Sequence, residues 1–307
     1  MHNRTKAVIA AAPWNDATIQ AIRESAELTW SIVSAPLTYA PRVSGRAPEA
    51  IPIDGHEVLY RSDTLQQLAI VPSSHRTWQP QDVIDFYLQL AQFYDMRLTR
   101  VGHIQGGRTI WGLIETGYGS RFVGKRSASS FLLLSTSCDS NLAARASALC
   151  LLEPGELALS AALRPHPTMR IPRTFEFLPP DTLIDIGDLI SECIAFPECL
   201  KELAHLPMSD ADARSALHLI LGSAQVPGHR APRLKSTEAV LMLFKAQAGR
   251  RRPTALDLLF ALAQHIDAQE LRKRPHDALY STWFGAGANR KQLAVSILRD
   301  MLITVVR

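Results

Sequence analysis

The hydrophobic residues of this chain follow different periodicities in its two halves. From about residue 183 to the end, apolar residues recur at helical spacing, and the breaks between successive helices fall at Pro207, Gly222 and Gly249. The first half instead alternates short apolar runs with segments rich in proline, glycine and serine, which is typical of strands. The sequence therefore predicts an α+β fold, with an N-terminal helix-plus-antiparallel-sheet core over residues 1–165 and a mostly helical domain over residues 166–307.

Local patterns predict the elements of the first half. Pro80 begins the clearest helix, which runs to about Tyr94 with its apolar residues at helical spacing. An earlier helix is expected over Asp16–Leu28. Strands are expected over Thr29–Tyr39, His56–Arg61, Leu65–Val71 and Phe131–Ser135. Surface loops are expected over Pro41–Asp54 and Thr116–Ser129, because both segments are rich in residues that break regular structure.

A β-hairpin is expected around Gln105-Gly106-Gly107. The flanking segments Met96–Ile104 and Arg108–Glu115 read as strands, and adjacent glycines readily adopt the positive backbone angles of short turns. Trp111 lies on the apolar part of this hairpin and is expected in the core. The last helix is expected over Ala286–Val306, where the apolar side chains form one stripe.

Composition places the chain among ordinary globular proteins of the cytoplasm. Its 307 residues are 47% hydrophobic and 20% charged, and no apolar run approaches the ~18 residues that a membrane-spanning helix needs. The apolar run Ala7–Pro13 is too short for a signal peptide. The four cysteines, Cys138, Cys150, Cys193 and Cys199, lack zinc-site spacing and are too few for a disulfide framework, so buried thiols are expected.

The motifs of enzyme chemistry are incomplete, so the sequence predicts no catalytic residue, cofactor or metal site. Gly119–Arg126 has the glycine and lysine spacing of a phosphate-binding loop, but Arg126 stands where a magnesium-binding hydroxyl is needed. Histidines occur singly, and no nucleophile elbow is present. Asp181, Asp185 and Asp188 share a spacing that a divalent metal could bridge, which leaves a metal-dependent nuclease as the third-ranked hypothesis; such a row is more often a solvated helix face.

Positive charge is concentrated on and beside the predicted hairpin. Between residues 97 and 126 one acidic residue, Glu115, opposes six basic residues: Arg97, Arg100, Arg108, Arg121, Lys125 and Arg126. The local charge is +5 within a chain of net charge +4. Arginine forks and neighbouring glycines suit contact with a phosphate backbone. The opposing interpretation is that exposed arginines merely solvate a hairpin, and charge alone does not decide between the two.

Two aromatic residues lie within the basic segment. Tyr118 and Phe122 could stack on unpaired bases. We therefore take them as candidate stacking residues beside the six candidate phosphate contacts.

The segment at residues 57–115 has a specific part, "GGRTIW" at residues 106–111, and a second specific part is "WFGAGANRKQ" at residues 283–292. With these segments the chain resembles, over nearly its whole length, a bacterial phage/plasmid-like family, domain of unknown function 932. "LTWSIVSAPLTY" at residues 28–39 and "FLLLSTSCDSNLAARASALC" at residues 131–150 resemble its opening strand and its strand-and-turn block. The sequence departs from the family pattern after Cys150, where Leu151–Gly155 replaces an expected asparagine-rich stretch.

The resemblance implies a mobile genetic element and brings no catalytic residues with it. The order of helix, basic hairpin, strand and helix is also similar to that of single-strand annealing proteins, which do not hydrolyse nucleotides. The sequence thus favours a non-catalytic DNA-binding protein for single-strand annealing in recombination, assembled as a homo-oligomeric ring or filament. The alternative is a phage or plasmid accessory protein whose helical half binds a host defence or regulatory protein.

Overall fold

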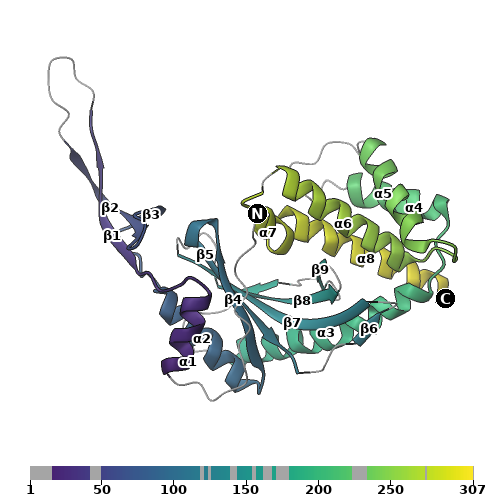
Figure 1. Cartoon of the computed structure of the whole chain (residues 1–307), viewed down its shortest axis with the longest axis horizontal. Coiled ribbons are helices and arrows are strands. Elements are labelled where there is room, and N and C mark those ends of the chain that lie inside the picture. The colour runs from purple at the N-terminus through teal and green to yellow at the C-terminus, as the bar shows by residue number, and fades with distance from the viewer. Residues whose placement is uncertain are drawn as a thin grey trace. The chain divides into compact units, whose positions relative to one another are not determined.

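The structure is a computed structural model with an α+β fold, as predicted (Figure 1). It describes residues 16–41, 50–117, 121–123, 126–138, 144–153, 157–161, 168–170, 180–222, 234–273 and 275–306. The strands are β1 (Ile32–Tyr39), β2 (Ile51–Arg61), β3 (Gln67–Pro72), β4 (Arg97–Ile104), β5 (Thr109–Glu115), β6 (Arg121–Val123), β7 (Arg126–Ser137), β8 (Arg145–Glu153), β9 (Leu157–Ser160) and β10 (Thr168–Arg170).

Helices dominate the second half of the chain. They are α1 (Asp16–Ser25), α2 (Pro80–Phe93), α3 (Pro180–His205), α4 (Asp210–Gly222), α5 (Leu234–Ala248), α6 (Ala255–Lys273), α7 (Ala278–Trp283) and α8 (Ala286–Val306). A short 3-10 turn, η1 (Gln105–Gly107), joins β4 to β5. In the described residues, no helix is both long enough and apolar enough to cross a membrane.

The strands form two sheets. The first has the order β1-β2-β3 and is antiparallel, with Val33 opposite Tyr60 and Val58 opposite Ile70. The second has the order β10-β8-β7-β5-β4, with β6 paired to β7 and β9 paired to β8. The adjacency of β4 and β5 confirms the hairpin predicted around Gly106 and Gly107.

The chain divides into two compact units, and the division is not a single cut near residue 165. Unit 1 comprises residues 1–114, 134–145 and 170–178, and unit 2 comprises residues 115–133, 146–169 and 179–307. Unit 1 thus contains the three-stranded sheet, α1, α2 and the β4–β5 hairpin, whereas unit 2 contains the long helices.

Helix α2 begins and ends where the sequence predicts. Pro80 occupies the first turn, and the backbone N–H of Gln79 donates to Asp82 Oδ2 over 3.1 Å. The side chain of Gln79 also donates to Ile32 O and accepts from Ile32 N, at 3.1 and 2.8 Å, and so binds the first residue of β1. On the buried face of the helix, Tyr87 donates its hydroxyl to Ile110 O over 3.1 Å. Helix α2 therefore positions both β1 and β5.

Two predicted loops are wrong in part. Residues 51–54, which the sequence assigned to the loop Pro41–Asp54, are the first residues of strand β2. In this strand, Ile51 pairs with Tyr39 and Pro52 pairs with Thr38. Residues 42–49 of that loop lie outside the described residues.

The predicted loop Thr116–Ser129 contains β6 and the start of β7. Val123 pairs with Arg126, and both Val123 and Ala128 are buried in the core of unit 2. The sequence gave little indication of a strand here, because residues 126–130 have small or polar side chains. Whether such side chains are buried depends on neighbours far along the chain.

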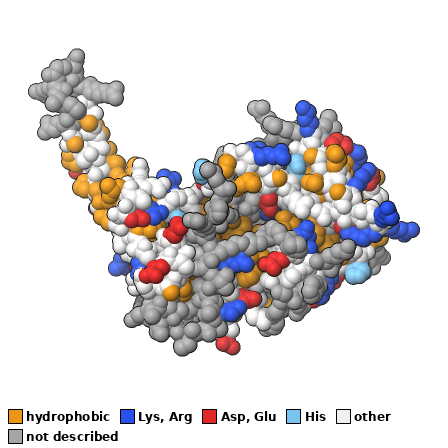
Figure 2. Space-filling model, viewed as in Figure 1, with side chains coloured by type: hydrophobic (Ala, Val, Ile, Leu, Met, Phe, Trp, Pro, Cys, Tyr) orange, Lys and Arg blue, Asp and Glu red, His pale blue; other side chains and the backbone are white. Residues whose placement is uncertain are grey.

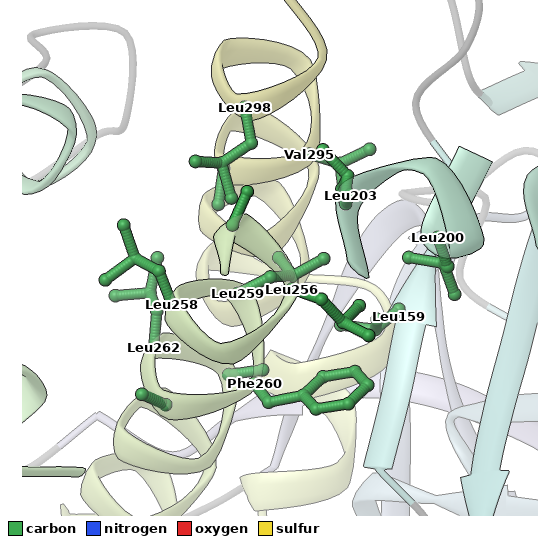
Figure 3. Close-up of a cluster of buried hydrophobic side chains, with 14 of the residues drawn as sticks. Leu159, Leu200, Leu203, Leu256, Leu258, Leu259, Phe260, Leu262, Val295 and Leu298 are labelled. Atoms are coloured by element: carbon green, nitrogen blue, oxygen red, sulfur yellow. The ribbon is translucent and has the colours of Figure 1, made fainter. Parts of the chain in front are cut away.

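The core of unit 2 is a cluster of aliphatic and aromatic side chains from the helices and from β6, β7, β8 and β9. Figure 3 shows Leu256, Leu259 and Phe260 of α6 beside Leu159 of β9 and Val295 of α8. Within the helix predicted over Ala286–Val306, the side chains of Ala294, Val295 and Leu298 are fully buried, and those of Ile297, Met301 and Leu302 are partly buried against this cluster.

A buried ion pair crosses this core. Lys291 of α8 is 1% exposed, and its Nζ lies 2.5 Å from Asp267 Oδ1 of α6 and 3.0 Å from Ala158 O of β9. Burial lowers the pKa of Lys291, and the charge of Asp267 opposes this change. Burial raises the pKa of Asp267, and the charge of Lys291 opposes that change. Lys291 belongs to the "WFGAGANRKQ" segment, so this part of the sequence holds α6, α8 and β9 together.

We expect the two halves of this pair to differ in their importance for stability. Asp267→Asn leaves an almost fully buried ammonium without a counter-charge and should cost about 3–5 kcal/mol. Lys291→Met leaves a carboxylate that is 32% exposed, which water can reach, and should cost less. Urea unfolding of both variants and of the double variant measures this, and the double variant should be more stable than Asp267→Asn. Equal losses in the two single variants would contradict this account of the pair.

A second prediction concerns the β4–β5 turn. Gly107 has φ +105°, and a Cβ there would lie 2.6 Å from Cζ2 of Trp30. Gly55 has φ +75° with open space around it, so it provides a matched control. Gly55→Ala should cost about 1–3 kcal/mol from backbone strain, and Gly107→Ala about 1–3 kcal/mol more from the clash. Thermal and urea unfolding check the difference, and equal losses would show that Trp30 yields easily.

Candidate nucleic-acid interface

Three of the six predicted phosphate contacts lie on the β4–β5 hairpin of unit 1. Arg97 is exposed and Arg100 is half-buried on β4, and both have interactions within the fold. Arg108 is exposed directly after η1. Its backbone is fixed on both sides, because its N–H donates to Gln105 O over 3.4 Å and its carbonyl accepts from Cys138 N over 3.0 Å. Arg108 therefore presents an exposed cationic side chain from a held backbone.

The other three predicted contacts belong to unit 2. Arg126 is half-buried at the start of β7, with its guanidinium carbon 5.1 Å from the ring centroid of Phe260 on α6. This cation–π contact gives Arg126 a packing role that the sequence did not indicate. Arg121 and Phe122 lie on β6, but the structure does not describe their side chains. Tyr118 and Lys125 lie outside the described residues.

The six basic residues are thus divided between the two units. Arg97, Arg100 and Arg108 belong to unit 1, whereas Arg121, Lys125 and Arg126 belong to unit 2. Among the described residues, the basic residues that belong both to the hairpin and to one unit are the three arginines of unit 1. Sequence proximity alone had grouped all six.

A seventh arginine, which sequence reasoning missed, anchors the hairpin turn. Arg61, at the end of β2, binds Asp63 through Nε at 2.9 Å and Nη2 at 2.6 Å, and it donates from Nη1 to Gly106 O over 3.2 Å. Its guanidinium carbon lies 4.5 Å from the ring centroid of Trp30. The side chain is 10% exposed, so Arg61 is committed to structure and is not offered to a ligand. We call Trp30, Arg61, Asp63 and Gly106 the Arg61 anchor.

His103 of β4 packs edge-on against Trp30, with ring centroids 6.3 Å apart. Neither ring nitrogen has a hydrogen-bond partner among the described residues. Burial lowers the pKa of His103, and the charge of Arg61 lowers it further, whereas Glu27 and Asp63 oppose the change. His103 is therefore a neutral imidazole beside the anchor at neutral pH. Histidines are scattered singly along the sequence, so nothing in it indicated this position.

A second basic segment was also missed. Arg250, Arg251 and Arg252 follow α5 in unit 2, and all three are exposed. Arg251 forms a two-point ion pair with the buried carboxylate of Asp257. Arg250 and Arg252 flank it, which makes this turn a rival position for phosphate contacts. The three successive arginines in the sequence could have indicated this basic segment.

The reactive side chains elsewhere are placed for structure. The four cysteines are free and buried, as predicted, and burial raises the pKa of Cys150 to about 12 and that of Cys199 to about 11. Of the three acids on α3, Asp185 and Asp188 are exposed, and the side chain of Asp181 lies outside the described residues. In the described part of the chain, no three His, Cys, Asp or Glu residues are grouped to hold a metal ion.

The Arg61 anchor predicts a dependence of stability on acid pH. The hydrogen bonds and charge of Arg61 lower the pKa of Asp63 from 3.8 to about 2. Because the folded pKa lies below the unfolded one, the stabilisation is present above about pH 4 and is lost as the pH falls towards 2. The parent should lose more stability over this window than Asp63→Asn does, and urea unfolding at each pH measures the difference. Parallel pH profiles for the two proteins would contradict the ion pair's contribution.

Comparison with known proteins supports the resemblance over part of the chain. Residues 67–151 match the model of a family described as domain of unknown function (DUF932). The match includes "GGRTIW" and ends at the start of the divergent segment after Cys150, whereas "WFGAGANRKQ" lies outside it. No curated protein and no solved structure matches the chain. The segment from β3 to β8, which contains α2 and the arginine-bearing hairpin, is therefore a match to domain of unknown function 932.

Proposed function

We propose that this protein binds single-stranded DNA through its phosphate backbone, without catalysis, and promotes strand annealing in recombination on a mobile genetic element. In this proposal it works in the cytoplasm as a homo-oligomeric ring or filament. The observation that carries the proposal is the exposed Arg108 on a backbone held by Gln105 and Cys138. A fixed backbone with a long cationic side chain suits a contact that positions a strand without reading its sequence.

The charge balance around Arg108 supports this assignment. Arg97 is a second exposed cation of the same hairpin. The acid of the Arg61 anchor, Asp63, is paired with Arg61, which reduces its repulsion of an incoming phosphate. Because annealing needs the bases free to pair, contacts to phosphate suit this function better than contacts to base edges. The proposal needs no nucleotide site and no metal.

A second candidate function follows from the helices of unit 2. Leu219 of α4, Met242 of α5 and Leu271 of α6 are exposed by 59%, 74% and 59%. Exposed apolar side chains favour protein partners where they form a contiguous patch. The alternative is therefore an accessory protein that binds a host defence or regulatory protein through these helices.

The test is a salt titration of binding to a fluorescent single-stranded oligonucleotide, followed by anisotropy. We expect the parent to bind with a steep salt dependence and Arg108→Ala to bind more weakly, with the salt slope reduced by about 0.7 per lost phosphate contact. The loss should be similar for oligonucleotides of different sequence. Arg272→Ala, which removes an exposed arginine of α6 in unit 2, is the matched control and should bind like the parent.

The remaining outcomes decide between the candidates. If the double variant Arg250→Ala/Arg252→Ala loses binding and Arg108→Ala does not, the interface is the turn after α5 and the hairpin assignment is wrong. If the parent shows no salt-dependent binding, the DNA-binding proposal fails and the host-partner function takes first place.

A further inference from the structure

Three strands of the seven-stranded sheet begin or end at the same end of that sheet. β5 and β7 are antiparallel, because the N–H of Cys138 donates to Arg108 O over 3.0 Å and the N–H of Thr116 donates to Ser130 O over 3.4 Å. β7 and β8 are neighbours, and their connection is shorter than the dozen residues that a parallel pair needs. β5 therefore begins, β7 ends and β8 begins at one end of the sheet.

Strand β10 reaches the same end. It is the neighbour of β8 in the sheet. The boundary between the two units passes between Arg145 and Ala146 in β8 and between Met169 and Arg170 in β10. Because these neighbouring strands are divided at these points, Arg170 lies beside the start of β8 and belongs to unit 1 with Arg145. Arg108, Arg145 and Arg170 thus mark this end of β5, β8 and β10.

The connection between β3 and α2 brings a fourth arginine to this end of the sheet. Directly after β7, the carbonyl of Cys138 accepts a hydrogen bond from His75 Nε2 over 2.9 Å. Arg76 follows His75 and is exposed. The same Cys138 binds the carbonyl of Arg108 through its N–H. One residue therefore joins the connection that carries Arg76 to the start of β5.

The side chains of these four arginines are available to a ligand. Basic side chains are scattered among acidic and hydrophobic ones on the face drawn in Figure 2, so the presence of arginine alone does not select a site. Arg76, Arg108 and Arg170 are exposed, and Arg145 is half-buried. Among the residues that the structure describes, no hydrogen bond or ion pair engages any of these four side chains, whereas Arg97 has an interaction within the fold. A guanidinium bound only by water can exchange that water for a phosphate.

We propose that Arg76, Arg108, Arg145 and Arg170 form one row of phosphate contacts, the arginine row, and that a DNA strand crosses this end of the sheet from β5 to β10. Neighbouring strands lie about 4.8 Å apart, so the three spacings from β5 to β10 cover about 14 Å. At about 3.4 Å per stacked nucleotide, this distance corresponds to about four nucleotides. Contacts to phosphate along this path leave the base edges free to pair.

This inference rests on the proposed function and deepens it by naming the path of the DNA strand. The charge pattern of the sequence predicted a path along the hairpin and the loop that follows it. The arginine row instead crosses the strands of the sheet and lies within unit 1. Its members are far apart in the sequence, so no local cluster of charge indicated them.

The first experiment measures the salt dependence of binding to a fluorescent oligothymidine of about twelve nucleotides by anisotropy. We expect Arg76→Ala, Arg145→Ala and Arg170→Ala each to reduce the salt slope by about 0.7, as Arg108→Ala does, because each removes one phosphate contact. Arg272→Ala, in an exposed position on α6 of unit 2, is the matched control and should keep the parent's slope. Thermal unfolding checks that each variant is folded.

The outcomes separate this inference from the proposed function. If Arg108→Ala weakens binding while Arg145→Ala and Arg170→Ala keep the parent's slope, the arginine row is wrong and the DNA-binding proposal stands. If the parent shows no salt-dependent binding, both are wrong.

The second experiment uses the unaltered protein. Phenylglyoxal modifies accessible arginine side chains, and mass spectrometry of the digested protein locates each modification. Bound oligothymidine should slow the modification of Arg76, Arg108 and Arg170 severalfold and should leave Arg272 as reactive as before. Protection of Arg108 alone, or equal protection of Arg272, would overturn the arginine row.

Discussion

The arrangement of unit 1 depends on the contacts of one group, the guanidinium of Arg61. It binds Asp63 in the β2–β3 turn, the carbonyl of Gly106 in the β4–β5 turn and the ring of Trp30 ahead of β1. One side chain thus ties the base of the three-stranded sheet to the hairpin. Its geometry explains the glycine at position 107, because any larger residue would meet Trp30. In unit 2, Lys291 has the corresponding role, since its ammonium joins α6, α8 and β9.

Arginines that are engaged in the fold can be distinguished from an arginine whose side chain is exposed to solvent. Arg61 and Arg126 are both engaged with aromatic rings, whereas Arg108 has an exposed side chain on a held backbone. A site that recognises phosphate needs cations whose solvation can be exchanged for a ligand, and a guanidinium already bound on three sides does not meet that need. In the proposed function, unit 1 therefore supplies an arginine contact from its hairpin.

Several elements could be predicted because their signals are local. The start of α2 follows from Pro80 and the capping pair of Gln79 and Asp82, and the β4–β5 hairpin follows from two adjacent glycines between apolar runs. The strands within the predicted loop Thr116–Ser129 could not be predicted in the same way. Val123 and Ala128 are buried only because distant helices pack on them, and that burial has no local signature. The position of His103 against Trp30 was hidden for the same reason.

The amino-acid sequence by itself determined the division into strands and helices, the buried thiols and the concentration of arginines near the hairpin, because each depends on periodicity, composition or spacing along the chain. The tertiary structure decided which arginines are engaged and that the six basic residues are divided between two units. These properties depend on pairing register and on contacts between residues far apart in the chain, and a one-dimensional pattern of residue types does not contain either.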